Sequence, residues 1–154
     1  MVNSDLQTGF YFSLRLPDDP TSADAAFQEV SGLAKEVGVE EVVSGGENRF
    51  KYRLPTGVSY QNLVLKRGIL LRTSSLVKWC VESMDGGHGK AIATKDVQIR
   101  LLNPNGKVAM GWHFTNAWPV KWAISDLRSQ ENAMLIETIE LAYHYFELSG
   151  RDGA

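Results

Sequence analysis

The sequence predicts a mainly β protein with a single α-helix. Most of its apolar residues alternate with polar residues over short runs, which is the spacing of strands that bury one face. The pair Asn105-Gly106 separates two such runs and is typical of a tight β-hairpin turn. Only the stretch 76–84 has apolar residues at helical spacing, so we expect one helix among many strands.

The N-terminal half contains strand patterns separated by turn residues. In the first pattern, Phe12 and Leu14 share one face. Pro17 and Pro20 end this run, and the polar stretch 21–26 is a connector of unassigned conformation. The strands expected in this half are 10–16, 27–33, 37–43 and 60–71.

A helix is expected over about 74–85. Thr73, Ser74 and Ser75 offer hydroxyl groups of the kind that cap a helix N-terminus. Gly86-Gly87 then ends the helical pattern, because glycine favours the backbone conformations found after a helix.

The C-terminal half is again β, with a tail over 149–154 that we expect to fray. Residues 116–119 and 125–132 interrupt the strand pattern. In 133–148 apolar residues fall on both faces, which indicates that both faces are covered. A chain this small has few elements for that purpose, so a partner chain is a natural cover. The strands expected here are 91–102, 107–115, 120–124 and 133–148.

Composition places the chain in the globular class. Of its 154 residues, 44% are hydrophobic and 22% are charged, and we expect a single domain over 1–154. The formal net charge of −2, with no cluster of basic residues, argues against general binding of nucleic acid. We expect no secretory signal at the N-terminus and no membrane insertion, because no apolar run approaches the roughly 20 residues that span a bilayer.

The sequence offers no catalytic, cofactor-binding or metal-binding residues. The histidines lie far apart, and Cys80 falls within the helix pattern as a buried thiol. The glycine-rich stretch 86–90 lacks the spacing of a phosphate-binding loop. Adjacent Glu40 and Glu41 point to opposite faces of a strand, as do Glu137 and Glu140, and are expected on solvated faces or in subunit contacts.

The tryptophans are interpreted as core residues rather than as a binding platform, because those in strands follow the apolar faces. They are Trp79, Trp112, Trp118 and Trp122.

A long polar loop over about 43–58 exceeds what a compact domain needs. Its aromatic and aliphatic residues argue against disorder, so we expect it to dock on a neighbouring copy of the same protein. The residues expected to make these contacts are Gly45, Gly46, Glu47, Asn48, Arg49, Phe50, Tyr52, Leu54 and Pro55.

Several strings in this order resemble the tail tube proteins of contractile phage tails and contractile injection systems. They include Phe27–Leu33, Gly45–Asn48, Leu63–Gly68, Leu76–Trp79, Trp112, Asn116–Trp122, Asn132 and Glu137–Ala142. The resemblance covers nearly the whole chain.

The resemblance implies a β-barrel-like fold of two packed antiparallel sheets with one flanking α-helix, shared with the tube subunit of type VI secretion. It implies six copies in a ring and stacked rings in a hollow tube that delivers protein cargo or DNA. The implied partners are further copies, the sheath, the baseplate or spike, and other tube subunits. Assembly would take place in the bacterial cytoplasm, as part of a phage tail or phage-tail-like particle, and no catalytic residues are implied.

The sequence leaves open the position of this chain along a tube and two other functions. The connector 17–26 and the ending 143–146 differ from the usual pattern of the family, and such differences separate repeated shaft subunits from copies next to the baseplate spike. A type VI tube ring that carries effectors is a second reading. A small β-barrel enzyme or ligand-binding domain, with tryptophans around a pocket, is a third.

Overall fold

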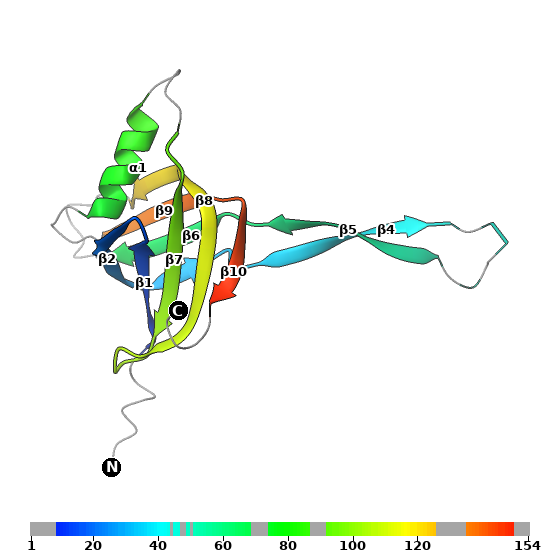
Figure 1. Ribbon diagram of the computed structural model, residues 1–154, viewed down its shortest axis with the longest axis horizontal. Coiled ribbons are helices and arrows are strands. Elements are labelled where there is room, and N and C mark those ends of the chain that lie inside the picture. Colours follow the sequence, from blue (N-terminus) through cyan, green and yellow to red (C-terminus); the bar gives the residue numbers. More distant parts are fainter. Residues whose placement is uncertain are drawn as a thin grey trace, which may run out of the picture.

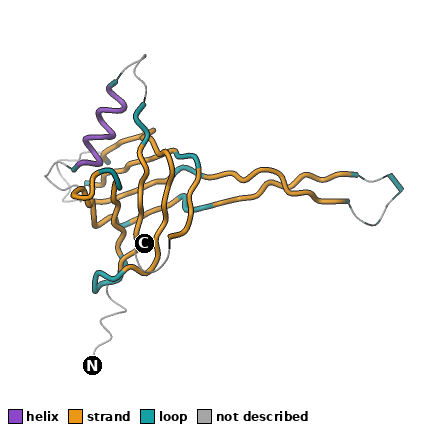
Figure 2. Tube along the Cα trace, in the orientation of Figure 1, coloured by secondary structure: helices purple, strands orange, loops and turns teal. Residues whose placement is uncertain are grey.

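The computed structural model describes residues 9–43, 45–46, 49, 51–68, 74–86, 92–125 and 135–149 (Figure 1). The prediction of a mainly β fold with one helix is confirmed, since strands make up most of the trace in Figure 2. The elements are β1 (Tyr11–Leu16), β2 (Asp19–Phe27), β3 (Glu29–Ser31), β4 (Lys35–Val42), β5 (Tyr52–Tyr60), β6 (Leu63–Gly68), α1 (Ser75–Asp85), β7 (Lys95–Leu102), β8 (Val108–Ile124), β9 (Ile136–Ala142) and β10 (Tyr145–Ser149).

The body of the molecule is a barrel-like pair of antiparallel sheets that share the 17-residue strand β8. The first half of β8 lies between β7 and β10, and its second half pairs with β9. On the far side the chain passes directly from β2 in one sheet to β3 in the other. There Gln28 donates its backbone N–H to the carbonyl of Lys66 at 3.0 Å. The two sheets are therefore connected at two places, through the shared strand β8 and through the passage from β2 to β3.

The core fills the space between the sheets, and α1 closes one side of it (Figure 1). The Ser74 hydroxyl accepts from the backbone N–H of Val77 at 3.0 Å and caps α1. The helix buries Leu76, Trp79 and Cys80 against the barrel. The largest fully buried side chains are Phe27, Phe114, Leu14, Leu16, Leu63, Leu65, Leu76, Ile99, Ile139, Leu141, Val97 and Cys80.

Residues 116–119 do not interrupt the sheet, contrary to the sequence-based expectation. Strand β8 runs through them because Asn116 adopts a φ of 53°, which bends the strand without ending it. The bend is held by Asp96, whose carboxylate accepts from the Asn116 N–H at 3.1 Å. Pro119 lies next to an irregularity in the pairing with β9, where the absence of a donor is tolerated.

The expected strand over 133–148 is in fact two strands, β9 and β10. Glu137, Ile139 and Leu141 point inward, and after the break at 143–144 the inward positions change from odd to even numbers, so that Phe146 is buried. Apolar residues on both sides of the sequence pattern are therefore explained by this change of face, and the pattern of this segment by itself does not require a partner chain.

Two further boundaries differ from the sequence pattern. The connector left unassigned over 21–26 belongs to β2, which pairs with β1. Strand β7 begins at Lys95, and residues 92–94 before it are not in a strand. Polar composition hid β2 because a strand at the border of a sheet is specified more by pairing than by hydrophobicity.

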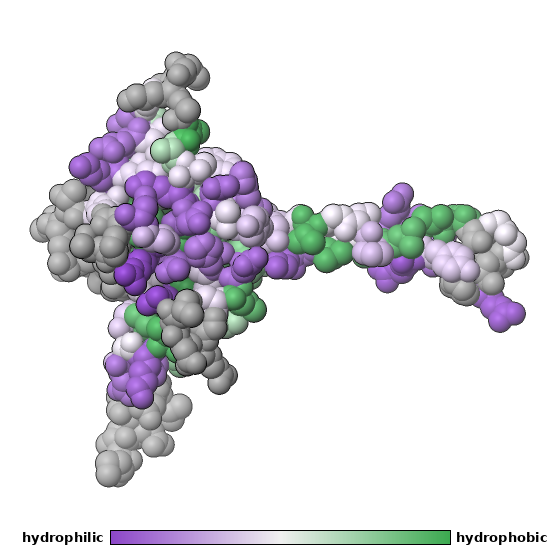
Figure 3. Space-filling model, viewed as in Figure 1, coloured by the Kyte–Doolittle hydropathy of each residue, from purple (hydrophilic) through white to green (hydrophobic). Residues whose placement is uncertain are grey.

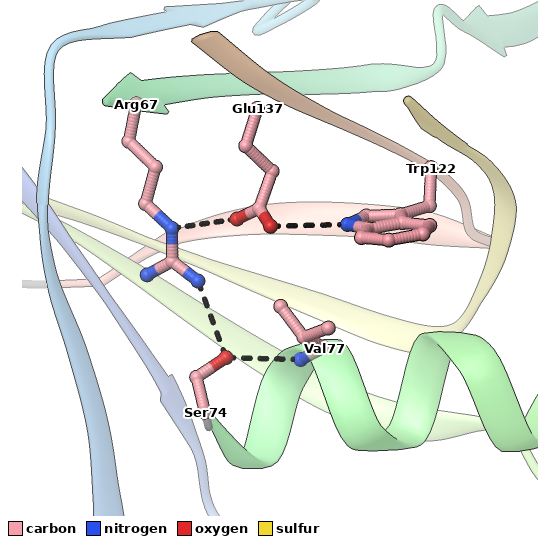
Figure 4. Close-up of polar contacts among 5 residues, drawn as sticks. All are labelled: Arg67, Ser74, Val77, Trp122 and Glu137. Carbon is pink, nitrogen blue, oxygen red and sulfur yellow. Dashed lines mark hydrogen bonds and ion pairs between the residues drawn. The ribbon is translucent and has the colours of Figure 1, made fainter. Parts of the chain in front are cut away.

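A buried ion pair ties the second sheet to the helix (Figure 4). The Nε of Arg67 donates to Glu137 Oε1 at 2.8 Å, and both side chains are almost fully buried. Trp122 Nε1 donates to Glu137 Oε2 at 3.0 Å, and Arg67 also reaches the Ser74 hydroxyl at 3.2 Å. The Arg67 guanidinium lies 4.6 Å from the centre of the Phe27 ring. The expectation that Glu137 is solvated or at a subunit contact was wrong, because it is the internal partner of Arg67.

Replacing Glu137 with alanine leaves the buried Arg67 charge without this partner, so we expect a loss of about 3 to 5 kcal/mol in unfolding free energy, measured in urea. Lys66→Ala is the matched control, because its pair with Glu29 at 3.8 Å is exposed. It should cost less than about 1 kcal/mol. Equal effects of the two variants would contradict this account of the ion pair.

Candidate assembly interface

Strands β4 and β5 form a two-stranded hairpin that projects from the barrel (Figures 1 and 2). We call the described part of residues 35–60 the arm. The expectation of a polar loop over 43–58 is corrected here, because residues 52–60 are a strand that pairs with 35–42. Pro55 and Gly57 hid this strand in the sequence. They are tolerated because β5 is an edge of a two-stranded sheet.

The pairing of the arm shifts at one point. Val37 pairs with Val58, whereas Val39 pairs with Pro55, so β5 contains one residue more than β4 in this interval. Gly38 lies opposite the extra residue, and a β-carbon at this position would collide with the hydroxyl of Thr56. Glycine at 38 therefore leaves room for the present position of the Thr56 hydroxyl. The bulge also changes which β5 side chains share a face with those of β4.

The arm carries exposed apolar side chains on both faces of a single two-stranded layer. Figure 3 shows hydrophobic patches along the visible side of the arm. Cross-strand partners share a face, so Val37, Val39, Pro55 and Val58 form one cluster near the barrel, the root patch. Val42, Tyr52 and Leu54 form the distal patch on the other face. Half of the Val37, Val39, Leu54 and Val58 side chains is exposed, at 50 to 52%. A lone two-stranded hairpin is marginally stable in water, and exposed apolar patches of this kind are typical of interaction surfaces.

Polar groups of both signs accompany the patches. Glu41 pairs with Lys51 at 3.7 Å, and both side chains are more than half exposed. Glu40 and Arg49 are also exposed. The arm therefore offers apolar contact and charges of either sign, without the single-sign field that recognises nucleic acid.

Not all of the residues expected to make assembly contacts lie within the described structure. Gly45 and Gly46 form a turn in which Gly46 has a φ of 97°, accessible to glycine at low cost. Arg49, Tyr52, Leu54 and Pro55 are exposed on the arm. Glu47, Asn48 and Phe50 lie outside the described residues.

The arm joins the barrel through an aromatic cluster that sequence reasoning missed. The Lys35 ammonium lies 5.7 Å from the centre of the Tyr60 ring and 5.3 Å from that of Phe146. Tyr60 also meets Tyr143 edge-to-face at 5.8 Å, and Tyr143 meets Phe114 at 4.8 Å. We call these five residues the arm root. Their positions in the sequence lie far apart, so no local pattern could reveal the cluster.

The four tryptophans occupy different environments. Trp79 and Trp112 are buried in the core. Trp122 packs against the core and donates to Glu137. Trp118 pairs across strands with Ala142 and is partly exposed, with its ring 5.8 Å from that of His144. They do not line one shared surface.

The described residues contain no group of three histidine, cysteine, aspartate or glutamate side chains placed to hold a metal ion. Among the helices of this same part of the chain, none is both long and apolar enough to cross a membrane.

Comparison of the sequence with models of protein families identifies the family of this chain. Residues 8–147 match the model of the T4-like virus tail tube protein gp19 family. The chain belongs to this family. A comparison with curated protein sequences returned no match.

Solved structures agree with the tail tube assignment. A chain in the anti-feeding prophage baseplate is 30% identical, with 92% of each chain covered and a TM-score of 0.74. A chain in the sheath-tube complex of the extracellular contractile injection system PVC is 21% identical, covering 92% of this chain and 90% of that one, with a TM-score of 0.73. Hcp1 from Flavobacterium johnsoniae has the same fold at 17% identity, with 92% and 96% covered and a TM-score of 0.56. The expected tail tube architecture is confirmed, and the family is structural rather than enzymatic.

Within the arm root, the hydroxyl group of Tyr143 has a pKa that differs from its ordinary value. Burial, with a smaller contribution from Tyr60, raises the pKa of Tyr143 from 10.0 to about 12. The unfolded chain therefore loses this proton at lower pH than the folded chain. The corresponding stability is complete below pH 10 and is lost as the pH rises towards 12.

We expect alkaline unfolding of the wild-type chain to be steeper than that of Tyr143→Phe between pH 10 and 12. The difference should approach about 1.4 kcal/mol per pH unit, the value of one proton bound differently by the two states. Urea unfolding at several pH values measures it. Parallel curves for the two proteins would show that Tyr143 titrates as it does in the unfolded chain.

Proposed function

We propose that this tail tube protein assembles into six-membered rings that stack as the inner tube of a contractile injection system. The observation that carries the proposal is the arm, whose two apolar patches have no core in the single chain. Contact between the arm of one copy and the barrel of another would remove both patches from water. At roughly 25 cal/mol per Å² of apolar surface buried, such contacts repeated in every subunit are a strong drive to assemble.

Closed rotational symmetry suits this arrangement. The arm and the barrel are different surfaces, so their contact is heterologous and repeats until the ring closes or the stack ends. The structures with the same fold include a sheath-tube complex and a tube-terminating cap, which supports a tube built from this chain. Sheath and baseplate proteins are then its outer and terminal partners, and the bore carries protein cargo or DNA.

Along the tube, we favour a position next to the baseplate. The match from the anti-feeding prophage baseplate structure is 30% identical, whereas those from the cap and from the sheath-tube complex are each 21% identical. This difference supports a subunit that begins the tube over one that repeats along the shaft. Binding of the purified rings to an isolated baseplate complex, compared with binding to preformed shaft rings, tests the position. Preference for shaft rings would contradict it.

Shortening the arm should abolish tube formation and leave the barrel folded. Val37 and Val58 are cross-strand partners, so residues 38–57 can be replaced by Asn-Gly, the pair that closes a two-residue hairpin. We expect unfolding free energy to change by less than about 1 kcal/mol, because no core residue is removed. Circular dichroism and negative-stain microscopy measure the two outcomes. Long tubes from the shortened chain would contradict the proposal.

Two point variants distinguish the effect of the distal patch on stacking from the effect of a new charge anywhere on the same strand. Leu54→Asp places a charge in the distal patch and should prevent stacking. Ser59→Asp places the same charge on the same strand, next to the barrel and outside both patches, and should stack normally. Both side chains are exposed, so neither variant should change unfolding by more than about 0.5 kcal/mol.

A further inference from the structure

The hydroxyl group of Tyr143 is buried and has no hydrogen-bond partner among the described residues. The residue is only 9% exposed, in the segment that joins β9 to β10. Buried hydroxyl groups are almost always paired, because an unpaired one has lost its water without replacement. The unpaired hydroxyl of Tyr143 therefore suggests a second state of the protein in which this hydroxyl has a hydrogen-bond partner.

The surroundings in this chain offer the hydroxyl little to donate to. Three rings meet Tyr143 edge-to-face, Phe114 at 4.8 Å, Tyr60 at 5.8 Å and Phe146 at 6.1 Å between centres. The nearby charged group of the arm root is the Lys35 ammonium, which is a donor and has no acceptor site. The raised pKa of Tyr143 is consistent with this environment, since burial disfavours the phenolate and Tyr60 adds a smaller effect in the same direction.

The contacts that hold the arm to the barrel at this point are ring edges and a cation over ring faces. The energies of these contacts change gradually with angle, so the contacts tolerate small rotations better than directional hydrogen bonds do. Beyond the root, β4 and β5 pair with each other and have no extensive contact with another element. The side chains of the arm root, which include Tyr143, therefore join the arm to the barrel beside the β3–β6 pair, whose strands continue into the arm.

We propose that the arm root is a joint with two settings, and that Tyr143 donates a hydrogen bond only when the arm is docked on another copy of this chain. The proposal rests on the proposed function. Docking pulls on the arm and shifts Tyr60 and Lys35 across the cluster, which opens the hydroxyl to a carbonyl or carboxylate oxygen at the new contact. The free subunit bears an unpaired buried group, and the assembled subunit does not. Assembly is favoured by this difference in addition to the burial of the patches.

The test is the variant Tyr143→Phe, which removes the hydroxyl and keeps the ring. Removing an unpaired buried group stabilises the free subunit, so its melting temperature should rise by about 3 °C or more. Removing a hydrogen bond formed on docking weakens assembly, so the critical concentration for tube formation should rise about fivefold to tenfold. If the hydroxyl had only a structural role, a variant with a higher melting temperature would assemble at the same or a lower critical concentration than wild type.

Tyr11→Phe is the matched control, because it removes the hydroxyl of a half-buried tyrosine on β1, away from the arm root. It should leave both measurements near the wild-type values. The tyrosine Raman doublet, taken as the difference between wild type and Tyr143→Phe, gives a second readout. It should report an unbonded hydroxyl in free subunits and a donating one in tubes.

Each outcome decides the proposal. If Tyr143→Phe destabilises the free subunit, the hydroxyl is already paired there and the proposal is overturned. If wild type forms tubes and the variant forms them equally well, the proposed role of the Tyr143 hydroxyl in docking is overturned and the proposed function stands. If wild type forms no rings at any concentration, the proposed function fails and this inference fails with it.

Discussion

A two-stranded sheet such as the arm has no second layer against which to bury its side chains, and the proposed assembly of this protein depends on that constraint. The barrel has a core of apolar residues between two sheets, whereas the arm has a single layer and leaves valine, leucine and tyrosine side chains exposed on both faces. Sequence selection for solubility alone would replace these residues with polar ones. Their presence is the observation on which the proposed contact with another copy rests.

The barrel provides the rigid base that such an arm needs. Strand β8 belongs to both sheets, and its bend at Asn116 is fixed by Asp96. The buried pair of Arg67 and Glu137 connects the second sheet to the cap of α1 through Ser74. These interactions are directional, so they hold the body in one geometry. The arm root is held instead by ring contacts and a cation near ring centres, which are less directional than hydrogen bonds.

The sequence predicted the elements that have a regular pattern. The face shared by Leu63 and Leu65 is buried as expected, and Asn103–Lys107 closes the turn between β7 and β8 with two backbone hydrogen bonds. The resemblance to tail tube proteins supplied the architecture, which composition and spacing could not give. Burial of Arg67 fits the alternation with Leu63 and Leu65, but its partner Glu137 is 70 positions away and has no local signal.

The sequence-based errors have a common physical origin. Pro55 and Gly57 were assigned to a loop because both residues are poor in central strands, yet β5 is stabilised by pairing with one strand alone. The change of face at 143–144 mimics a strand that is apolar on both sides. The aromatic cluster of the arm root brings together residues from 35 to 146, so only the folded chain reveals it.

Hydrogen exchange along the arm tests most directly the claim that other copies complete it. Amide exchange of residues 35–60 would be followed by mass spectrometry in free subunits and in assembled tubes, with the strands of the barrel as the internal reference. The account predicts rapid exchange of the arm relative to the barrel in the free chain and strong protection in the tube. Equal exchange of the arm in both states would contradict it.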